Sequence, residues 1–175
     1  SSFYQDSNRM SRYLRMLGLS IVFFVFALDL ASKALMFSAL TKAGGLINLL
    51  PFFDFRLGFN HGVSFGLLSS QSDWAPWLLA AVALGISAYL SMRLWRATTK
   101  TQAIWIGLII GGALGNAVDR LVDGAVTDFL DIHINGYHWP TFNLADVAIV
   151  IGVAIIIFDG FRNTIADRSD PPATL

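Results

Sequence analysis

Residues Leu14–Leu35 read LRMLGLSIVFFVFALDLASKAL, an apolar run in which Arg15, Asp29 and Lys33 are the charged residues. A helix of roughly 20 apolar residues is long enough to cross the hydrocarbon core of a bilayer. The run therefore predicts a membrane-spanning helix. A cleavable signal peptide has a shorter apolar region followed by a small-residue cleavage site, so we expect this helix to be retained.

The whole chain has the composition of a membrane protein. Of its 175 residues 55% are hydrophobic and 14% charged, whereas about a quarter of an ordinary soluble domain is charged. Three further runs are long enough to span a bilayer, at Trp74–Leu94, Gln102–Val122 and Leu144–Phe161. We therefore expect an all-α membrane protein with four transmembrane helices. A net charge of zero gives no reason to expect nucleic acid, and the lack of Cys excludes disulfides and thiolate chemistry.

Basic residues predict the orientation, because Lys and Arg are enriched in the cytoplasmic flanks of membrane spans. One set of span ends carries Arg9, Arg12, Arg15, Arg93, Arg96, Lys100, Arg162 and Arg168. The opposite flanks carry Lys42 and Arg56, with Arg120 at the boundary. Both termini are therefore expected in the cytoplasm, and residues 40–73 and 123–141 outside. We expect one membrane-embedded domain over residues 11–166, a disordered tail or cloning remnant at 1–10 and a C-terminal tail at 167–175.

The two outer segments alternate apolar and polar residues, which is the period of a half-buried strand. Phe53–Phe59 predicts a strand with its phenylalanines against the membrane surface, and Val126–Ile134 predicts a second strand. Asn135-Gly136 then supplies a hairpin turn. These strands predict a small β-sheet platform. Asp128 falls on the apolar side of its strand, and a buried carboxylate is costly unless it has partners.

Polar residues in the spans are candidates for function, because they are expensive in lipid. Asp29 and Lys33 stand four apart on one helix face and predict an ion pair. Asn116 and Asp119 share a face of the third span. For Asp29, Lys33, Asp119 and Arg120, structural support is the favoured interpretation. Gly107, Gly111 and Gly115 form a small-residue stripe that predicts close packing with a neighbouring helix.

Asp146 opens the fourth span three residues after Asn143, a plausible N-cap, and alone it is ordinary helix chemistry. The topology places Asp128 and Asp146 at the same depth. Two carboxylates that share a site hold one proton, so one can act as a base on water while its partner acts as an acid. No metal or other cofactor is expected, because His61, His133 and His138 lack a metal-binding spacing.

Five blocks of sequence, in order along the chain, carry a resemblance to a known family. They are DLASK at Asp29–Lys33, NHGVSF at Asn60–Phe65, GGALGNAVDR at Gly111–Arg120, VTDF at Val126–Phe129 and FNLAD at Phe142–Asp146. Together they resemble bacterial lipoprotein signal peptidase, also called signal peptidase II. Leu30 departs from this family, which commonly has a polar residue such as Gln there, but both aspartate motifs are intact.

The resemblance implies an aspartyl endopeptidase that removes the signal peptide from prolipoproteins, cutting on the N-terminal side of a cysteine bearing a diacylglyceryl group. It implies that Asp128 and Asp146 are the catalytic pair. The positions that it marks as substrate-binding or supporting are Asn60, Gly62, Asn116, Arg120, Asn143 and Ala145, and those that it marks as structural are Asp29, Lys33 and Asp119. It also implies residence in the bacterial inner membrane among lipids, an active site near the outer face, and binding of globomycin-like inhibitors there.

Three other interpretations remain open at this point. A transporter or proton relay would also bury acids and a lysine, but around a site at the membrane midplane. A serine peptidase could pair Ser64 with Lys33, whereas Ser32 adjoins Lys33 on a helix and points elsewhere. A non-catalytic scaffold would use the polar groups only to hold its helices together.

Overall fold

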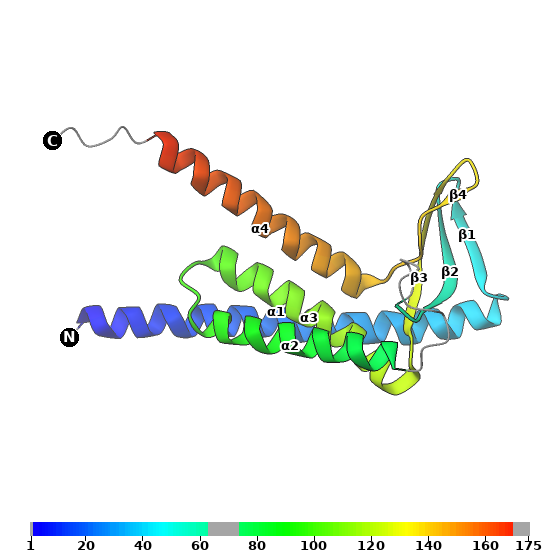
Figure 1. Ribbon diagram of the computed structural model, residues 1–175, viewed down its shortest axis with the longest axis horizontal. Helices are drawn as coiled ribbons and strands as arrows, with labels where there is room; N and C mark the ends of the chain where they lie inside the picture. Colours follow the sequence, from blue (N-terminus) through cyan, green and yellow to red (C-terminus); the bar gives the residue numbers. More distant parts are fainter. Residues whose placement is uncertain (1, 63–73, 170–175) are drawn as a thin grey trace.

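The described residues form four long helices and one small sheet, and the sheet lies at one end of the helices (Figure 1). The structure is a computed structural model that describes residues 2–62 and 74–169. Its helices are α1 (Ser2–Lys42), α2 (Ala75–Trp95), α3 (Lys100–Asp123) and α4 (Leu144–Ser169). All four are long and apolar enough to cross a membrane. The predicted four-helix membrane fold is therefore confirmed.

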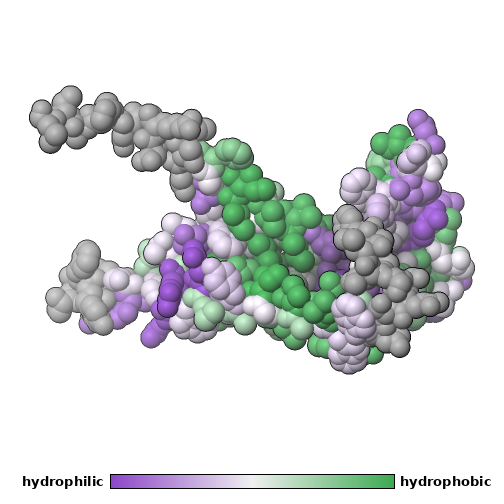
Figure 2. Space-filling view, viewed as in Figure 1, coloured by the Kyte–Doolittle hydropathy of each residue, from purple (hydrophilic) through white to green (hydrophobic). Residues whose placement is uncertain are grey.

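The first described turns of α1 and the last of α4 lie at the end opposite to the sheet (Figure 1). Figure 2 shows apolar surface along the middle of the helices and hydrophilic surface toward the two ends. α1 begins at Ser2, so it runs through most of the stretch expected to be a tail. The division into one domain and two tails stays a prediction.

α3 is the most enclosed helix and packs against each of the other three. A side chain at Gly107 would overlap the Gly18 carbonyl and Ile21 of α1, and one at Gly111 would overlap Val25. The predicted small-residue contact is thus confirmed, and its partner is α1. The third span carries Asn116, Asp119 and Arg120 in its last turns, yet it forms the centre of the fold.

The sheet is antiparallel throughout, in the order β1 (Leu46–Leu50), β2 (Phe53–Asn60), β3 (Val126–Ile134) and β4 (Tyr137–His138). The two predicted strands, β2 and β3, are confirmed. So is the predicted hairpin, in which Asn135 and Gly136 have φ angles of 50° and 82°, as a turn with two positive φ values requires. Strand β1 was not predicted.

The outer half of β3 does not follow the predicted burial. Asp128 is buried as expected, at 1% exposure, but Ile132 and Ile134 are 43% and 67% exposed while Asp131 is fully buried. Asp131 Oδ2 lies 2.7 Å from Arg56 Nε and 2.8 Å from His138 Nδ1. Beyond Phe129 the strand has left the helices, so polar pairs with β2 and β4 replace an apolar core.

The close approach of α3 to α1 makes a testable prediction at Gly115. A methyl group there would overlap Asp29 Oδ2. Overpacking of this kind costs about 1–3 kcal/mol, so Gly115→Ala should lower the thermal unfolding midpoint in detergent. Gly85→Ala is the matched control, because a Cβ at Gly85 meets nothing within 4 Å and Ala is the better helix former. Equal effects of the two substitutions would contradict this packing.

Candidate active site

Asp128 and Asp146 come together because the chain between them folds back along β3. Phe142 forms a bridge with Leu130, in which Phe142 N donates to Leu130 O at 3.1 Å and Leu130 N donates to Phe142 O at 2.9 Å. The next residue, Asn143, therefore lies beside the strand that carries Asp128. It also begins α4, whose first turn carries Asp146.

Two asparagine amides connect the aspartates. Asn143 Nδ2 donates to Asp128 Oδ1 at 2.7 Å and to Asn116 Oδ1 at 3.1 Å. Asn116 Nδ2 in turn donates to Asp146 Oδ1 at 2.8 Å. Each carboxylate thus has a fixed amide donor, and the two amides are bonded to each other. This chain of bonds fixes the Asp128 carboxylate of β3 and the Asp146 carboxylate of α4 relative to Asn116 of α3.

Asn143 and Asp146 also form a reciprocal cap at the start of α4. Asp146 N donates to Asn143 Oδ1 at 3.0 Å, and Asn143 N donates to Asp146 Oδ2 at 3.3 Å. Such a capping box satisfies backbone N–H groups that have no partner within the helix. The predicted N-cap is confirmed. Asp146 therefore caps its helix and also belongs to the carboxylate pair.

Lys33 is the buried cation of the site. Its Nζ lies 2.7 Å from Asp29 Oδ2, 3.0 Å from Asp119 Oδ2 and 3.0 Å from Asn116 Oδ1. The predicted Asp29–Lys33 ion pair is confirmed, and the structure adds two acceptors from α3. Two carboxylates and one amide oxygen thus surround the ammonium group, and a buried charge needs such partners.

The two acids that bind Lys33 also hold backbone next to the aspartate pair. Asp29 Oδ1 accepts from Ala145 N at 2.9 Å, one residue before Asp146. Asp119 Oδ2 accepts from Thr127 N at 3.1 Å, one residue before Asp128. Ala145 is fully buried, and its carbonyl lies where a side chain at Gly112 would be. Its contacts are therefore with the protein itself.

Strand β2 and the residues that follow it lie on another side of Asp128. Asn60 hydrogen-bonds to Asp128 through its side chain, and its Oδ1 accepts from Gly62 N at 2.8 Å. Gly62 has a φ of 87°, which favours glycine. Gly58 pairs with Asp128 in register, and a side chain there would overlap Thr141. Gly58 and Thr141 were not among the predicted site residues, although glycine within a strand is a signal of close approach.

Arg120 lies close enough to Asp146 and Asp128 to attract both carboxylates. Its Nη1 donates to the backbone carbonyl of Asn116 at 3.3 Å, while its Nε is buried without a hydrogen-bond partner among the described residues. The guanidinium supplies positive charge beside the pair.

The surroundings of Asp128 raise its pKa. Desolvation by burial, and then the like charge of Asp146, raises the pKa of Asp128 from 3.8 to about 7, against the opposing hydrogen bonds from Asn143 and Asn60. A carboxyl group with this pKa retains its proton at mildly acidic pH, where an ordinary aspartate is ionised. The pair can therefore hold one proton under conditions in which a base and an acid are both needed.

A cavity of about 600 Å³ lies beside the site, on the α1 side of β2 and β3. Its described lining combines the charged residues Lys33, Asp119 and Asp123 and the polar residues His61 and Thr127 with the apolar Leu30, Ala34, Phe37, Phe59 and Ala125. Leu30, the residue that departs from the family pattern, thus faces a space with a mixed apolar and charged wall.

Histidines were considered as metal ligands and serines as nucleophiles from the sequence, and their surroundings are as follows. His133 Nε2 lies 3.0 Å from Asp54 Oδ2, and His138 Nδ1 hydrogen-bonds to Asp131, so both rings lie beside a carboxylate of the sheet. No group of three or more His, Cys, Asp or Glu residues suited to a metal ion occurs among the described residues. Ser32 Oγ donates to Asp29 O at 2.9 Å. Ser64, with Val63 and Phe65 of its motif, lies outside the described residues.

The fold and this site define a class of protein, a polytopic membrane protein with a pair of aspartates, one buried and one partly exposed, at one end of its helices. The family described as signal peptidase (SPase) II matches residues 21–162. The chain belongs to the signal peptidase II family, which is a family of aspartic peptidases. The family and the enzyme class predicted from the sequence are confirmed.

Relatives and solved structures agree with this assignment. Lipoprotein signal peptidases of Yersinia pestis and Yersinia pseudotuberculosis are 47% identical over 156 residues, covering 87% of this chain and 89% of theirs. One solved bacterial membrane enzyme has a TM-score of 0.71 at 27% identity, covering 88% of this chain and 93% of its own. A second has a TM-score of 0.68 at 30% identity, covering 81% and 90%.

The raised pKa of Asp128 makes a prediction that infrared spectroscopy can test. The C=O stretch of the protonated carboxyl should vanish with a midpoint near pH 7. In Asp146→Asn the like charge is gone, so this midpoint should move to lower pH, and in Asp128→Asn the band should be missing. Because the unfolded chain loses this proton near pH 3.8, the contribution of Asp128 to stability should fall as the pH rises toward 7. If the pH midpoint of the band were unchanged in Asp146→Asn, the charge of Asp146 would not raise the pKa of Asp128.

Proposed function

We propose that this chain removes the signal peptide from diacylglyceryl-modified prolipoproteins, cutting on the N-terminal side of the lipidated cysteine, with Asp128 and Asp146 as the catalytic pair. The observation that carries this proposal is the chain of amide bonds from Asp128 through Asn143 and Asn116 to Asp146. It holds two carboxylates in fixed positions, one of them with a pKa of about 7. The curated relatives are named lipoprotein signal peptidases.

The reaction follows from the different surroundings of the two carboxylates. Asp146 is partly exposed, accepts two N–H donors and lies at the positive end of α4. It serves as the base that takes a proton from water as the water oxygen attacks the scissile carbonyl carbon. Asp128, which holds its proton, donates a hydrogen bond to the carbonyl oxygen. That polarises the carbonyl and stabilises the tetrahedral intermediate.

Collapse of the intermediate completes hydrolysis. The C–N bond breaks, a proton passes from the pair to the leaving amine, and the products are a carboxylic acid and an amine whose first residue is the lipidated cysteine. Arg120 attracts the negative charge that accumulates at the site. Asn60 and Asn143 orient Asp128 through their hydrogen bonds. No metal or cofactor takes part in these steps.

The location of the site suits a substrate anchored by lipid. The aspartate pair lies where the helices meet the sheet, at the end that the distribution of Lys and Arg assigns to the outside of the bacterial inner membrane. Both termini are then cytoplasmic. The acyl chains of the substrate stay in the bilayer while the scissile bond reaches the interface. Globomycin-like inhibitors are expected to compete for this cleft.

Cleavage of a purified lipidated prolipoprotein peptide tests the catalytic pair. Asp128→Asn and Asp146→Asn should each lower kcat by about 10³-fold or more, because each removes an acid or base that the other cannot replace. Asp159→Asn is the matched control, since Asp159 pairs with Arg162 at the other end of α4, and it should retain full activity.

Ser64→Ala separates the aspartyl mechanism from a serine peptidase. Under the aspartyl mechanism this variant keeps its turnover, at most weakened. Loss of all turnover in Ser64→Ala, together with residual activity in both aspartate variants, would contradict the proposal. A chain that cleaves no lipidated substrate but moves a solute into proteoliposomes would instead support the transporter interpretation.

Phe59 tests whether the outer sheet forms part of the substrate platform. Its side chain is exposed, lines the cavity beside the site and lies 6.3 Å from the Phe37 ring. Partial burial of a phenylalanine by substrate contributes about 1 kcal/mol, so Phe59→Ala should raise KM roughly fivefold with kcat unchanged. Phe161→Ala, which removes an exposed ring from α4, should leave KM as it is. An unchanged KM in Phe59→Ala would show that the platform does not contact substrate.

A further inference from the structure

A second cavity, of about 220 Å³, lies between α2 and α3 at the end of the molecule opposite to the aspartate pair. Its described lining is Arg93, Arg96, Thr98, Gln102, Trp105 and Ile106. The two arginines come from the last turn and the C-cap of α2, and the other four residues come from the turn and the first turns of α3. Two guanidinium groups therefore share one small cavity that the peptidase reaction does not use.

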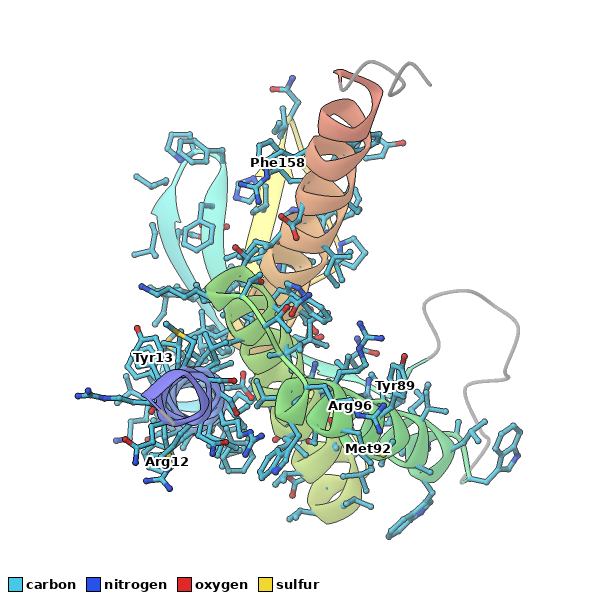
Figure 3. All side chains as sticks on the ribbon, turned by 90° about the vertical axis from the view of Figure 1, so that its left-hand side faces the viewer. Arg12, Tyr13, Tyr89, Met92, Arg96 and Phe158 are labelled. Atoms are coloured by element: carbon cyan, nitrogen blue, oxygen red, sulfur yellow. The ribbon has the colours of Figure 1, made fainter. Side chains whose placement is uncertain are left out.

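Within the described residues, the positive charge of the two arginines in this cavity is not neutralised by an ion pair. Neither Arg93 nor Arg96 takes part in an ion pair there. Arg15 and Lys100 add further positive charge, and each lies over an aromatic ring, Trp95 at 5.8 Å and Tyr13 at 5.6 Å. Figure 3 shows this end, with Arg12 and Tyr13 on α1 and Met92 and Arg96 on α2. An anionic ligand would supply the missing negative charge.

Hydrogen-bond donors accompany the two arginines. Gln102 Oε1 accepts from Thr98 N at 2.9 Å and from Thr98 Oγ1 at 3.2 Å. Its amide NH₂ group is left as a donor among the described residues. The N-terminus of α3 forms the same wall, and the N-terminal end of a helix favours negative charge. Guanidinium groups with neutral N–H donors match the oxygens of a phosphate group.

An apolar groove of about 500 Å³ adjoins this cavity and shares Arg96 with it. Ser91, Met92 and Trp95 complete its described lining, and Met92 and Trp95 are 62% and 53% exposed. Tryptophan concentrates at the depth of lipid headgroups. A ligand that fills both spaces carries a negative charge at one end and a hydrocarbon chain beside it. A membrane phospholipid has this combination, and free phosphate does not.

We propose that the cavity formed by Arg93, Arg96 and Gln102 binds the phosphate of an anionic membrane phospholipid, with an acyl chain of that lipid lying along Met92 and Trp95. Basic cavities between membrane-spanning helices bind anionic headgroups in this way. The site lies at the opposite end of the helices from the aspartates, so it does not depend on the proposed catalytic mechanism. The bound lipid would join the ends of α2 and α3.

Thermal unfolding of the full chain in a neutral detergent tests the site. Added dioleoylphosphatidylglycerol should raise the unfolding midpoint Tm at lower concentrations than the zwitterionic dioleoylphosphatidylcholine does. In Arg93→Gln/Arg96→Gln the concentration of phosphatidylglycerol that gives half of this rise should increase roughly thirtyfold, which corresponds to about 2 kcal/mol for the loss of two basic residues near an anionic headgroup. Arg162→Gln, an exposed arginine of α4 paired with Asp159, should behave as the parent chain.

Four results would overturn the proposal. The first is an unchanged lipid response in the double variant, and the second is an equally large change in Arg162→Gln, which would show that only the overall charge matters. The third is an equal response to phosphatidylcholine, which would show that no anion is recognised. The fourth is a full rise in Tm with inorganic phosphate alone, which would show that the cavity is a free-phosphate site. Peptide cleavage by the double variant in detergent should match that of the parent chain, so a loss of folding would be detected.

Discussion

The site depends on one buried ammonium group. Lys33 Nζ contacts Asp29, Asp119 and Asn116, and each of these residues makes a second bond that fixes part of the aspartate pair. Asp29 holds the backbone before Asp146, Asp119 holds the backbone before Asp128, and Asn116 binds the Asp146 carboxylate directly. One cation from α1 thereby positions α3, the start of β3 and the start of α4. Removal of its charge would leave two buried acids without a counter-ion, which is strongly destabilising.

This arrangement explains why so many polar groups lie among membrane-spanning helices. A buried charge is tolerated only when paired and hydrogen-bonded, and here the paired groups connect elements that no apolar contact could align with the same precision. Directional bonds on rigid helices hold catalytic groups within the small tolerance that chemistry requires. The glycines of α3 support these bonds by leaving room for them. Gly115 lets Asp29 approach closely enough to reach Ala145 N. Asp29 therefore depends both on its ion pair with Lys33 and on its close contact with Gly115.

Much of this could be predicted from the sequence, because some signals are local. The helices were predictable since the length and apolar character of a run decide whether it crosses a bilayer. The cap of α4 and the Asn135-Gly136 turn were predictable because each needs only a few neighbouring residues. The ion pair of Asp29 and Lys33 followed from their spacing on one helix. The motifs of the family then selected Asp128 and Asp146 among several buried acids.

Other features depend on contacts between distant segments, which local patterns do not encode. The sequence could not tell that Lys33 also binds Asp119 and Asn116, or that the bridge of Phe142 with Leu130 brings Asn143 to Asp128. Burial along β3 was predicted from alternation alone, and it was wrong beyond Phe129 because the strand leaves the helical core there. Strand β1 was missed because its pattern is weak and its partner, β2, decides its conformation.

In the proposed mechanism, one proton shared by Asp128 and Asp146 acts on the scissile amide. A structure of the chain with a lipidated peptide in which a hydroxyethylene group replaces that amide would test this mechanism. We expect the hydroxyl to lie within hydrogen-bond distance of both carboxylates. A hydroxyl bound instead beside Lys33 and Asp119 in the neighbouring cavity, out of reach of either aspartate, would contradict it.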